Sequence, residues 1–259
     1  MFTLSGKRAL VTGGGRGIGR AIVLALSSAG ADVAVTARSL LEIEAVAGVI
    51  RSAGGKALPV TCDVTDPLSV GELARRVEDA FGGLDILVNN AGSAQSHKFV
   101  DHPDELWHRM LDTNLTSVYY VTKAFAPMLV ESGGGRIINI ASTAARVGDR
   151  YVVAYTAAKH GVLGLTRALA AELVGQNVTV NAICPGYVDT PMTEATIDNI
   201  TARTGKDAEE ARWALEKMSL QKRLIEPEEV AALALFLAAE SSRGINGQAI
   251  NIDGGTVMS

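Results

Sequence analysis

The feature of this sequence that most constrains its fold is a series of short runs of valine, isoleucine, leucine and alanine, each followed by a helical pattern. The runs show almost no alternation of apolar and polar residues, which is typical of strands buried on both faces of a parallel sheet. Strands are predicted over residues 8–11, 32–36, 57–62, 84–88, 136–140, 178–183 and 249–252. Helices are predicted over residues 17–29, from 66 onward, and over 103–130, 151–173 and 227–239.

This alternation predicts an α/β fold of the Rossmann type, a doubly wound parallel sheet of about seven strands with helices on both faces. The chain has 259 residues, 47% of them hydrophobic, which suffices for a large core. There is no internal repeat and no linker, so we expect one domain over residues 1–259. Residues 191–224 are polar and partly helical, and we expect them to form a substrate loop over the carboxyl edge of the sheet.

The charge and the cysteines argue against several classes of protein. The formal net charge is −4, so there is no basic field for nucleic acid or anionic lipid. The longest apolar run, residues 230–239, is too short to span a bilayer, and the N-terminus does not resemble a signal peptide. Cys62 and Cys184 lie far apart, and no histidines or cysteines have the spacing of metal ligands. We therefore expect a cytoplasmic protein with no metal, membrane or nucleic-acid partner.

A glycine-rich turn joins the first predicted strand to the first predicted helix. Residues 12–19 follow the pattern T-G-x-x-x-G-x-G. Such a turn lets the backbone approach a pyrophosphate, and the helix N-terminus behind it provides N–H groups and positive potential. The alternative is a glycine turn that only allows tight packing. The predicted cofactor contacts in this turn are Gly13, Gly15, Arg16, Gly17, Ile18 and Gly19.

The end of the second predicted strand bears on the choice between NADP and NAD. NAD enzymes of this architecture usually place Asp or Glu there to bind the ribose 2′-hydroxyl. This chain has Arg38 at that point, and Arg16 lies in the glycine turn. Two guanidinium groups suit a 2′-phosphate, which favours NADP (NADPH) while NAD remains possible. The alternative is that either arginine simply faces solvent.

Further motifs follow the later strands, in order along the chain. They are Asn89-Asn90-Ala91-Gly92, Asn114, Ser142, Tyr155 with Lys159 in a YxxxK pattern, and Pro185-Gly186 with Thr190. Together with the glycine turn, these motifs resemble the single-domain short-chain dehydrogenase/reductase family over essentially the whole chain. Within that family the chain is most similar to 3-oxoacyl-[acyl-carrier-protein] reductases and related ketoreductases.

The chemistry of the YxxxK pair also follows from the residues themselves. Tyr155 and Lys159 are four residues apart on a predicted helix, so they share one face. A free phenol has a pKa near ~10, and we expect the adjacent ammonium to lower that pKa. Ser142, at a strand end, can donate a hydrogen bond to a substrate oxygen. The family resemblance implies that Lys159 also holds the nicotinamide ribose and that Asn114 anchors a water in a proton relay.

The remaining cofactor contacts are implied by the resemblance alone. Asp63 and Val64 would meet the adenine, Asn90, Ala91 and Gly92 would run along the cofactor, and Pro185, Gly186, Val188 and Thr190 would lie at the nicotinamide end. Asp63 and the two asparagines are also ordinary turn-forming residues, which is the alternative for each of them.

The function predicted from these motifs is an NADPH-dependent ketoreductase acting on a carbonyl or secondary alcohol, possibly of the 3-oxoacyl type. One alternative is an NAD-dependent alcohol or hydroxyacyl dehydrogenase of the same family, and another is a non-catalytic dinucleotide sensor. An epimerase is disfavoured because its usual longer C-terminal region is missing. The resemblance implies a homotetramer, in which the helices over 103–130 and 151–173 would pair between subunits.

Overall fold

The computed structural model describes residues 2–258, whose backbone is organised around one parallel β-sheet. The sheet has seven strands in the order β3-β2-β1-β4-β5-β6-β7. They are β1 (Arg8–Thr12), β2 (Asp32–Ala37), β3 (Ala57–Thr61), β4 (Ile86–Asn89), β5 (Arg136–Ile140), β6 (Thr179–Pro185) and β7 (Ala249–Ile252). The strand order changes direction between β1 and β4, which confirms the predicted Rossmann-type fold.

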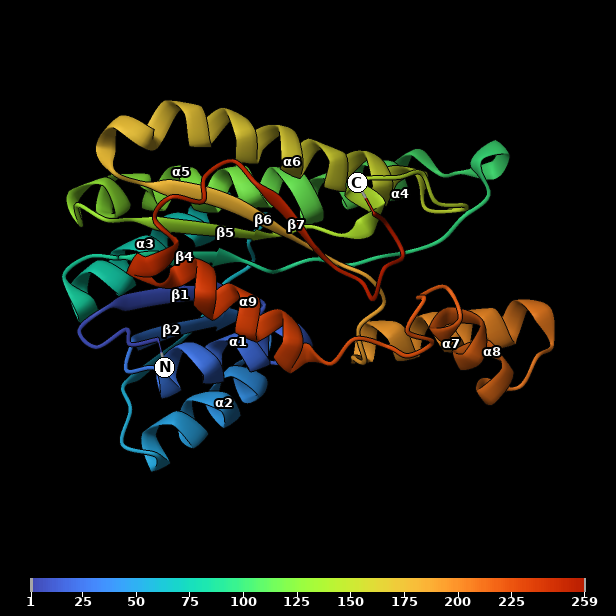
Figure 1. The fold of residues 1–259 in the computed structure, drawn as a ribbon, viewed down its shortest axis with the longest axis horizontal. Helices are drawn as coiled ribbons and strands as arrows, with labels where there is room; N and C mark the ends of the chain where they lie inside the picture. The colour runs from blue at the N-terminus through green and yellow to red at the C-terminus, as the bar shows by residue number, and fades with distance from the viewer. Residues whose placement is uncertain (1, 259) are drawn as a thin grey trace.

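Helices cover both faces of this sheet (Figure 1). Helices α1, α2 and α9 lie on one face, and α3, α5 and α6 lie on the other. The helices are α1 (Gly17–Ser28), α2 (Leu40–Ser52), α3 (Pro67–Phe81), α4 (Asp104–Leu111), α5 (Ser117–Glu131), α6 (Val153–Leu173), α7 (Pro191–Thr204), α8 (Ala208–Glu216) and α9 (Pro227–Ala238). No helix within residues 2–258 is long and apolar enough to cross a membrane.

Two apolar clusters form the core, one on each face of the sheet. Successive residues of β1 point to opposite faces, so Val11 packs with Ile22 of α1 while Leu10 packs in the cluster that contains Phe125 of α5. All these side chains are fully buried, and each contributes roughly 1.5–3 kcal/mol of transfer free energy. Burial on both faces explains why the strands read as continuous apolar runs.

The helix boundaries follow the expected signals in two places. At the start of α3, the Asp66 carboxylate accepts a hydrogen bond of 3.0 Å from the N–H of Leu68, and Pro67 occupies the first turn. After α1, the chain turns at Gly30, whose φ of 97° favours glycine.

Two helix boundaries and one whole helix differ from the prediction. The predicted helix over 103–130 is divided into α4 and α5 by a π-helical turn, Asp112–Thr116. The predicted helix over 151–173 begins later, at Val153, because Tyr151 has a positive φ of 68°. Helix α2 is absent from the predicted elements, and its mixture of exposed leucines with a central Gly48 gives a weak helical pattern.

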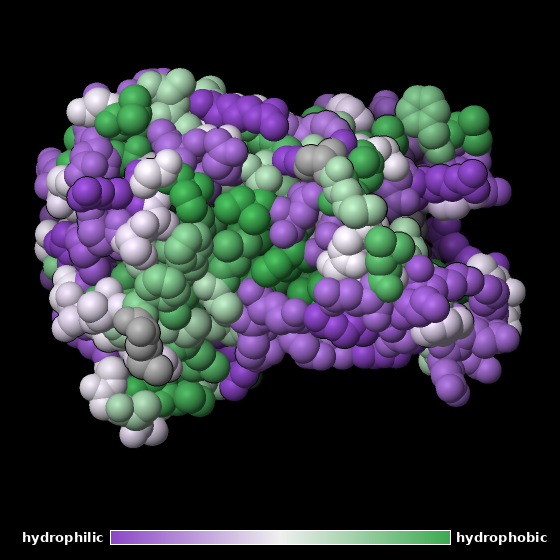
Figure 2. Space-filling model, in the orientation of Figure 1, coloured by the Kyte–Doolittle hydropathy of each residue, from purple (hydrophilic) through white to green (hydrophobic). Residues whose placement is uncertain are grey.

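Residues 191–224, predicted as a partly helical excursion, contain α7 and α8. The two helices stand beyond one edge of the sheet, apart from both helical layers (Figure 1). Their outward surface in this view is mostly hydrophilic (Figure 2), while their inner side chains form a small apolar cluster of their own. This unit therefore covers the edge of the sheet without joining its core.

Candidate active site

The carboxyl ends of the central strands bring most of the predicted site residues to one edge of the sheet. The strands β1, β4, β5 and β6 lie side by side and run parallel. They lead into the glycine turn, Asn90, Ser142 and Gly186, respectively. In doubly wound folds this edge, near the change in strand order, is where ligands bind.

Tyr155 and Lys159 are neighbours in the first half of α6, as their spacing predicts. The Nζ atom of Lys159 lies 5.7 Å from the centroid of the Tyr155 ring. It donates a hydrogen bond of 2.8 Å to the carbonyl oxygen of Ile140, the last residue of β5. Lys159 is 5% exposed, so its charged end is held beneath the site and away from bulk water.

The pKa values of this pair correct one expectation. Burial raises the pKa of Tyr155, although the nearby Ser142 side chain acts in the opposite direction. Burial also lowers the pKa of Lys159 to about 8. Loss of water disfavours the charged form of each group, and it is the main cause of both changes. The expected lowering of the Tyr155 pKa by Lys159 is therefore wrong for this structure, and the phenol is protonated at neutral pH.

Ser142 lies at the start of a short 3₁₀ turn, Thr143–Ala145, that follows β5. Its hydroxyl oxygen accepts a hydrogen bond of 3.1 Å from the N–H of Ala144. That bond uses one lone pair and fixes the side chain, while the hydroxyl proton remains available to another acceptor. Ser142 also interacts with Tyr155 and lowers the pKa of its phenol, so the two hydroxyl groups lie together.

Asn114 lies in the π-helical turn between α4 and α5, where its side chain binds two backbone segments. Its Nδ2 donates to the carbonyl oxygens of Met110 and Ser93, each at 2.9 Å. Its Oδ1 accepts from the N–H of Ser93 at 3.1 Å. Asn114 is fully buried and holds the loop after β4 against the helix. Turns of this kind occur frequently at functional sites.

Gly92 is the point at which Asn114 and Lys159 approach the same backbone. A Cβ atom on Gly92 would lie 2.9 Å from Oδ1 of Asn114 and 3.8 Å from Nζ of Lys159. A side chain at this position would therefore displace Asn114. The predicted group of Asn114, Ser142, Tyr155 and Lys159 comes from three places in the chain, namely the π-helical turn, the turn after β5 and helix α6.

The glycine turn has the geometry of an anion site. Gly13 and Gly17 have positive φ angles of 64° and 51°, and a Cβ atom on Gly19 would collide with the carbonyl oxygen of Gly13. Helix α1 begins at Gly17, and the Arg16 side chain forms no capping hydrogen bond to it. The first N–H groups of α1 therefore face the turn without a side-chain acceptor, an arrangement that suits the pyrophosphate of a dinucleotide.

Asn90 braces this turn from the neighbouring strand. Its Nδ2 donates to the carbonyl oxygens of Thr12 and Gly13, at 2.9 and 3.1 Å. The backbone N–H groups of Asn90 and Ala91 both donate to the Thr12 hydroxyl, each at 3.0 Å. Both side-chain amide hydrogens of Asn90 are thus used within the protein, and this residue shapes the turn directly.

The predicted adenosine end also contains a carboxylate from helix α2. Glu42 of α2 lies 3.6 Å from Arg16, and its side chain packs under Gly15. Arg38 is exposed at the end of β2 and is one of the groups that lower the pKa of Asp63. The larger causes are hydrogen bonds to Asp63 from Thr65, so Asp63 also forms an ordinary turn.

The opposite side of the predicted cofactor site is the corner between β6 and α7. Thr190 precedes α7, and a Cβ atom on Gly17 would lie 3.2 Å from its Cγ2. Val188 pairs with Ile225 in an isolated parallel bridge. Thr190 therefore lies directly against the glycine turn, and the corner that contains it closes this side of the site.

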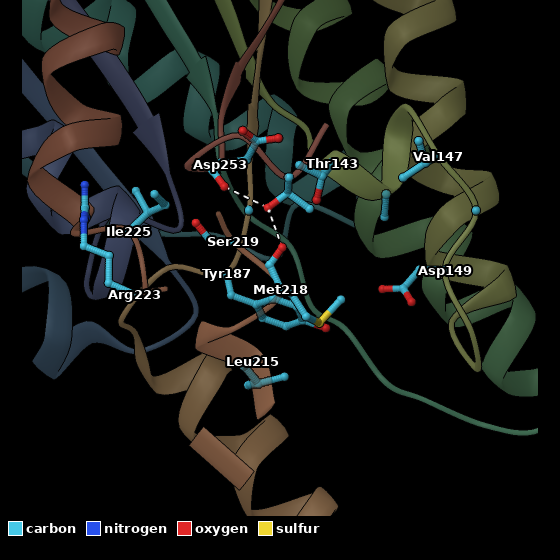
Figure 3. Close-up of a pocket in the computed structure, with 14 residues that line it drawn as sticks. Thr143, Val147, Asp149, Tyr187, Leu215, Met218, Ser219, Arg223, Ile225 and Asp253 are labelled. Carbon is cyan, nitrogen blue, oxygen red and sulfur yellow. Dashed lines mark hydrogen bonds between the residues drawn. The ribbon is translucent and has the colours of Figure 1, made fainter. Parts of the chain in front are cut away.

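A pocket opens beside Ser142, between the loop after β5 and the excursion. Its lining includes Val147 and Asp149 from the loop, Tyr187 from the corner, and Leu215 and Met218 from the end of α8. Figure 3 shows Tyr187, Leu215 and Met218 along one wall, with Asp149 on the other side. Burial, with smaller effects of Asp149 and Tyr155, raises the pKa of Tyr187 to about 12. The pocket therefore has a mixed polar and apolar lining, and it reaches Thr143, the residue after Ser142.

Comparison with known proteins assigns the family. A family model described as Enoyl-(Acyl carrier protein) reductase matches residues 13–257. The chain is 39% identical to 3-oxoacyl-[acyl-carrier-protein] reductase of a Synechocystis strain, with 100% of both proteins covered. The chain belongs to the short-chain dehydrogenase/reductase family. This family membership confirms the resemblance seen in the motifs.

Two further similarities describe this short-chain dehydrogenase/reductase more closely. It is 39% identical over 252 residues to D-beta-hydroxybutyrate dehydrogenase of Rhizobium meliloti, with 96% of this chain and 98% of that protein covered. Its fold matches a crystal structure of a variant actinorhodin polyketide ketoreductase with NADPH, with a TM-score of 0.93, 37% identity, and 96% and 97% of the two chains covered. The chain is therefore a nicotinamide-dependent oxidoreductase acting on carbonyl or hydroxyl groups.

Proposed function

We propose that this chain is an NADPH-dependent ketoreductase that reduces a carbonyl to a secondary alcohol, with 3-oxoacyl compounds as the leading substrate class. The observation that carries the proposal is the protonated, buried phenol of Tyr155, which lies beside the Ser142 hydroxyl. A protonated phenol is the form that can give a proton to a carbonyl oxygen. The similarity to 3-oxoacyl and polyketide ketoreductases supports the same direction.

The cofactor would lie along the carboxyl edge of the sheet. The N-terminus of α1 and the glycine turn would hold its pyrophosphate, with the backbone near Gly92 beneath it and Thr190 on the other side. Arg16 and Arg38 would hold the adenosine end, with Asp63 and Val64 near the base. When bound, NADPH supplies the hydride that reduces the carbonyl carbon.

The chain's own residues would position the carbonyl and move the proton. The Ser142 hydroxyl donates a hydrogen bond to the carbonyl oxygen and stabilises the negative charge that develops there. The Tyr155 hydroxyl then gives its proton to that oxygen, which becomes the alcohol, and a proton from solvent restores the phenol. Lys159 stabilises the transient phenolate through its positive charge, which it carries below its pKa of about 8.

The arginine at the ribose gives a test of the cofactor. Replacing Arg38 with Asp removes a guanidinium from a 2′-phosphate and offers a carboxylate to a free 2′-hydroxyl. The ratio of kcat/KM for NADPH to that for NADH should fall by about tenfold or more, as expected for the loss of a charge-assisted contact. The charge-matched variant Arg76→Asp, on the exposed face of α3, should leave the ratio unchanged. An unchanged ratio in Arg38→Asp would contradict the 2′-phosphate assignment.

A panel of ketones and alcohols, measured with both cofactors, tests the reaction itself. Wild-type protein should oxidise NADPH with 3-oxoacyl thioesters or simple ketones. Faster alcohol oxidation with NAD would favour the dehydrogenase alternative, which the similarity to D-beta-hydroxybutyrate dehydrogenase also suggests. Tight NADPH binding with no turnover of any substrate would favour a sensor and overturn the proposal.

We also propose that the enzyme is a cytoplasmic homotetramer. A tetramer with two-fold symmetry needs two different self-complementary faces. Tyr119, 46% exposed on α5, marks one face. Half-buried apolar side chains of α9 and β7, including Phe236 and Ile250, form a second face, where Figure 2 shows a broad hydrophobic area. Sedimentation should give about four times the chain's mass of 27.0 kDa, and a monomer would refute the assembly.

A further inference from the structure

The excursion formed by α7 and α8 has its own small core. Ile197 of α7 packs with Ala211 and Leu215 of α8 and with Leu224. Tyr187, which precedes α7 and lines the pocket, packs against this cluster. The two helices therefore form one unit. It is joined to the rest of the protein by the segments that lead to β6 and α9 and by a hydrogen bond of 2.8 Å from Asn199 of α7 to Ser96 in the loop after β4.

One arginine on α8 ties this unit together through three carboxylates. Nε of Arg212 donates to Glu216 at 3.1 Å, Nη1 to Glu194 at 2.9 Å, and Nη2 to Asp189 at 2.6 Å. All three nitrogens of the guanidinium are therefore used, in different directions. The hydrogen bond to Asp189 is the main cause of the raised pKa of Arg212, so Asp189 is its most strongly coupled partner.

Asp189 belongs to the corner that closes the proposed cofactor site. Its backbone N–H donates to the carbonyl oxygen of Ile225 at 2.9 Å, beside the bridge between Val188 and Ile225. The next residue, Thr190, lies against Gly17 of the glycine turn. A shift of Asp189 therefore moves Thr190 relative to the place where α1 presents its N–H groups.

The charge arrangement makes Arg212 necessary for this geometry. Without Arg212, three carboxylates would lose their shared cation and would repel one another. They are those of Asp189, Glu194 and Glu216. The arginine is 35% exposed, so its ion pairs add little to the free energy of unfolding of the whole chain. Its effect is instead concentrated on the orientation of the corner and of α7.

We propose that Arg212 is a positioning residue that holds the Asp189–Thr190 corner against the glycine turn and thereby sets the affinity for the nicotinamide cofactor. This inference rests on the proposed function, because it takes the glycine turn and Thr190 as the two sides of the cofactor site. Arg212 itself touches neither side, and it acts on the corner chiefly through Asp189.

The test compares two arginines that each bind several carboxylates. Arg212→Met removes the guanidinium that binds the three carboxylates, and Arg75→Met is its matched control. Arg75 binds Glu72 at 2.7 Å and Asp79 at 2.6 Å on α3, remote from the site. We expect Arg212→Met to raise the Kd of NADPH by about tenfold, as coupling through a shared network allows, with kcat reduced less than KM is raised. Arg75→Met should match wild type, and both variants should melt within a few degrees of it.

Further variants separate positioning from general damage. Asp189→Asn should raise the Kd of NADPH in the same direction as Arg212→Met, and the double variant should lose little more than either single one. Arg212→Lys, which keeps the charge but loses the fork of donors, should restore part of the affinity. If Arg212→Met fails to fold, Asp189→Asn alone decides the question by the same binding measurement.

Two results would overturn the inference, and neither is confused with failure of the proposed function. The first is a wild-type Kd of NADPH in Arg212→Met, or in Asp189→Asn if Arg212→Met does not fold. It would show that Arg212 does not act on the cofactor site. The second is a strictly additive effect of Arg212→Met and Asp189→Asn on the Kd of NADPH in the double variant. It would show that the two residues do not act together. The proposed function fails separately, if the wild-type protein itself reduces no carbonyl with NADPH.

Discussion

Turnover should fall by about three orders of magnitude when Tyr155 is replaced by Phe, while NADPH should still bind. The substitution removes only the hydroxyl, so the ring still fills its place on α6 beside Lys159. The carbonyl oxygen then has the hydrogen bond from Ser142 but no proton donor. Steady-state rates with the best substrate of the panel, combined with NADPH titration by fluorescence, measure both effects.

The control for this variant is Tyr119→Phe, which removes an exposed hydroxyl on α5 that accepts a hydrogen bond from Lys123 at 3.3 Å. It should retain full kcat. Activity within threefold of wild type in Tyr155→Phe would remove Tyr155 from the role of proton donor, and Ser142 would then be the next group to substitute.

Replacing Lys159 with Met should separate activity from stability. Turnover should fall by a factor of about 100 or more, because the phenolate of Tyr155 loses its stabilising charge. The free energy of unfolding should instead increase, because the substitution removes a charge whose burial is unfavourable. The pKa of Lys159 is lowered to about 8 by burial, below its unfolded value of 10.5, so the unfolded chain binds more protons between these values. Wild-type stability therefore gains from this group as the pH rises through that window.

The size of that gain can be measured by urea unfolding at two pH values. From pH 7 to pH 9.5 the Lys159 contribution should rise by about 2 kcal/mol in the wild type, and it should be missing in Lys159→Met. The exposed Lys56, which pairs with Asp32 at 3.3 Å, provides the control variant Lys56→Met, whose pH dependence should match wild type. Identical pH profiles for wild type and Lys159→Met would mean that the burial of Lys159 has no effect on its pKa.

The sequence predicted the fold because its strands are buried on both faces. Few polar residues lie within such strands, so apolar runs such as that of β4 identify the sheet, and the polar residues that follow them locate the site. The order of the motifs then placed Ser142, Tyr155 and Lys159 near one another. These predictions depend on local pattern and on the parallel arrangement of the strands, both of which can be predicted from the amino-acid sequence.

Other features depend on distances between segments, and the sequence did not reveal them. The contact between Arg16 and Glu42 forms because α2 crosses under the glycine turn, and neither residue differs in type from ordinary surface charge. The raised pKa of Tyr155 depends on how completely the surrounding loops exclude water, whereas the sequence suggested only its neighbour Lys159. Arg212 binds Asp189, a residue 23 positions away in the chain.

The π-helical turn Asp112–Thr116 is equivalent to one additional residue inserted into an otherwise regular helix. Deletion of one residue there would restore regular α-helical hydrogen bonding, and it would rotate α4 by about 100° relative to α5. The Asn114 side chain would then lose its place between Met110 and Ser93. The one extra residue in this turn thus makes the helix less regular but keeps the loop beside Gly92 ordered. Selection for a more stable helix would remove it, and selection for an ordered loop would keep it. A search for thermostable variants should therefore leave the length of this segment unchanged.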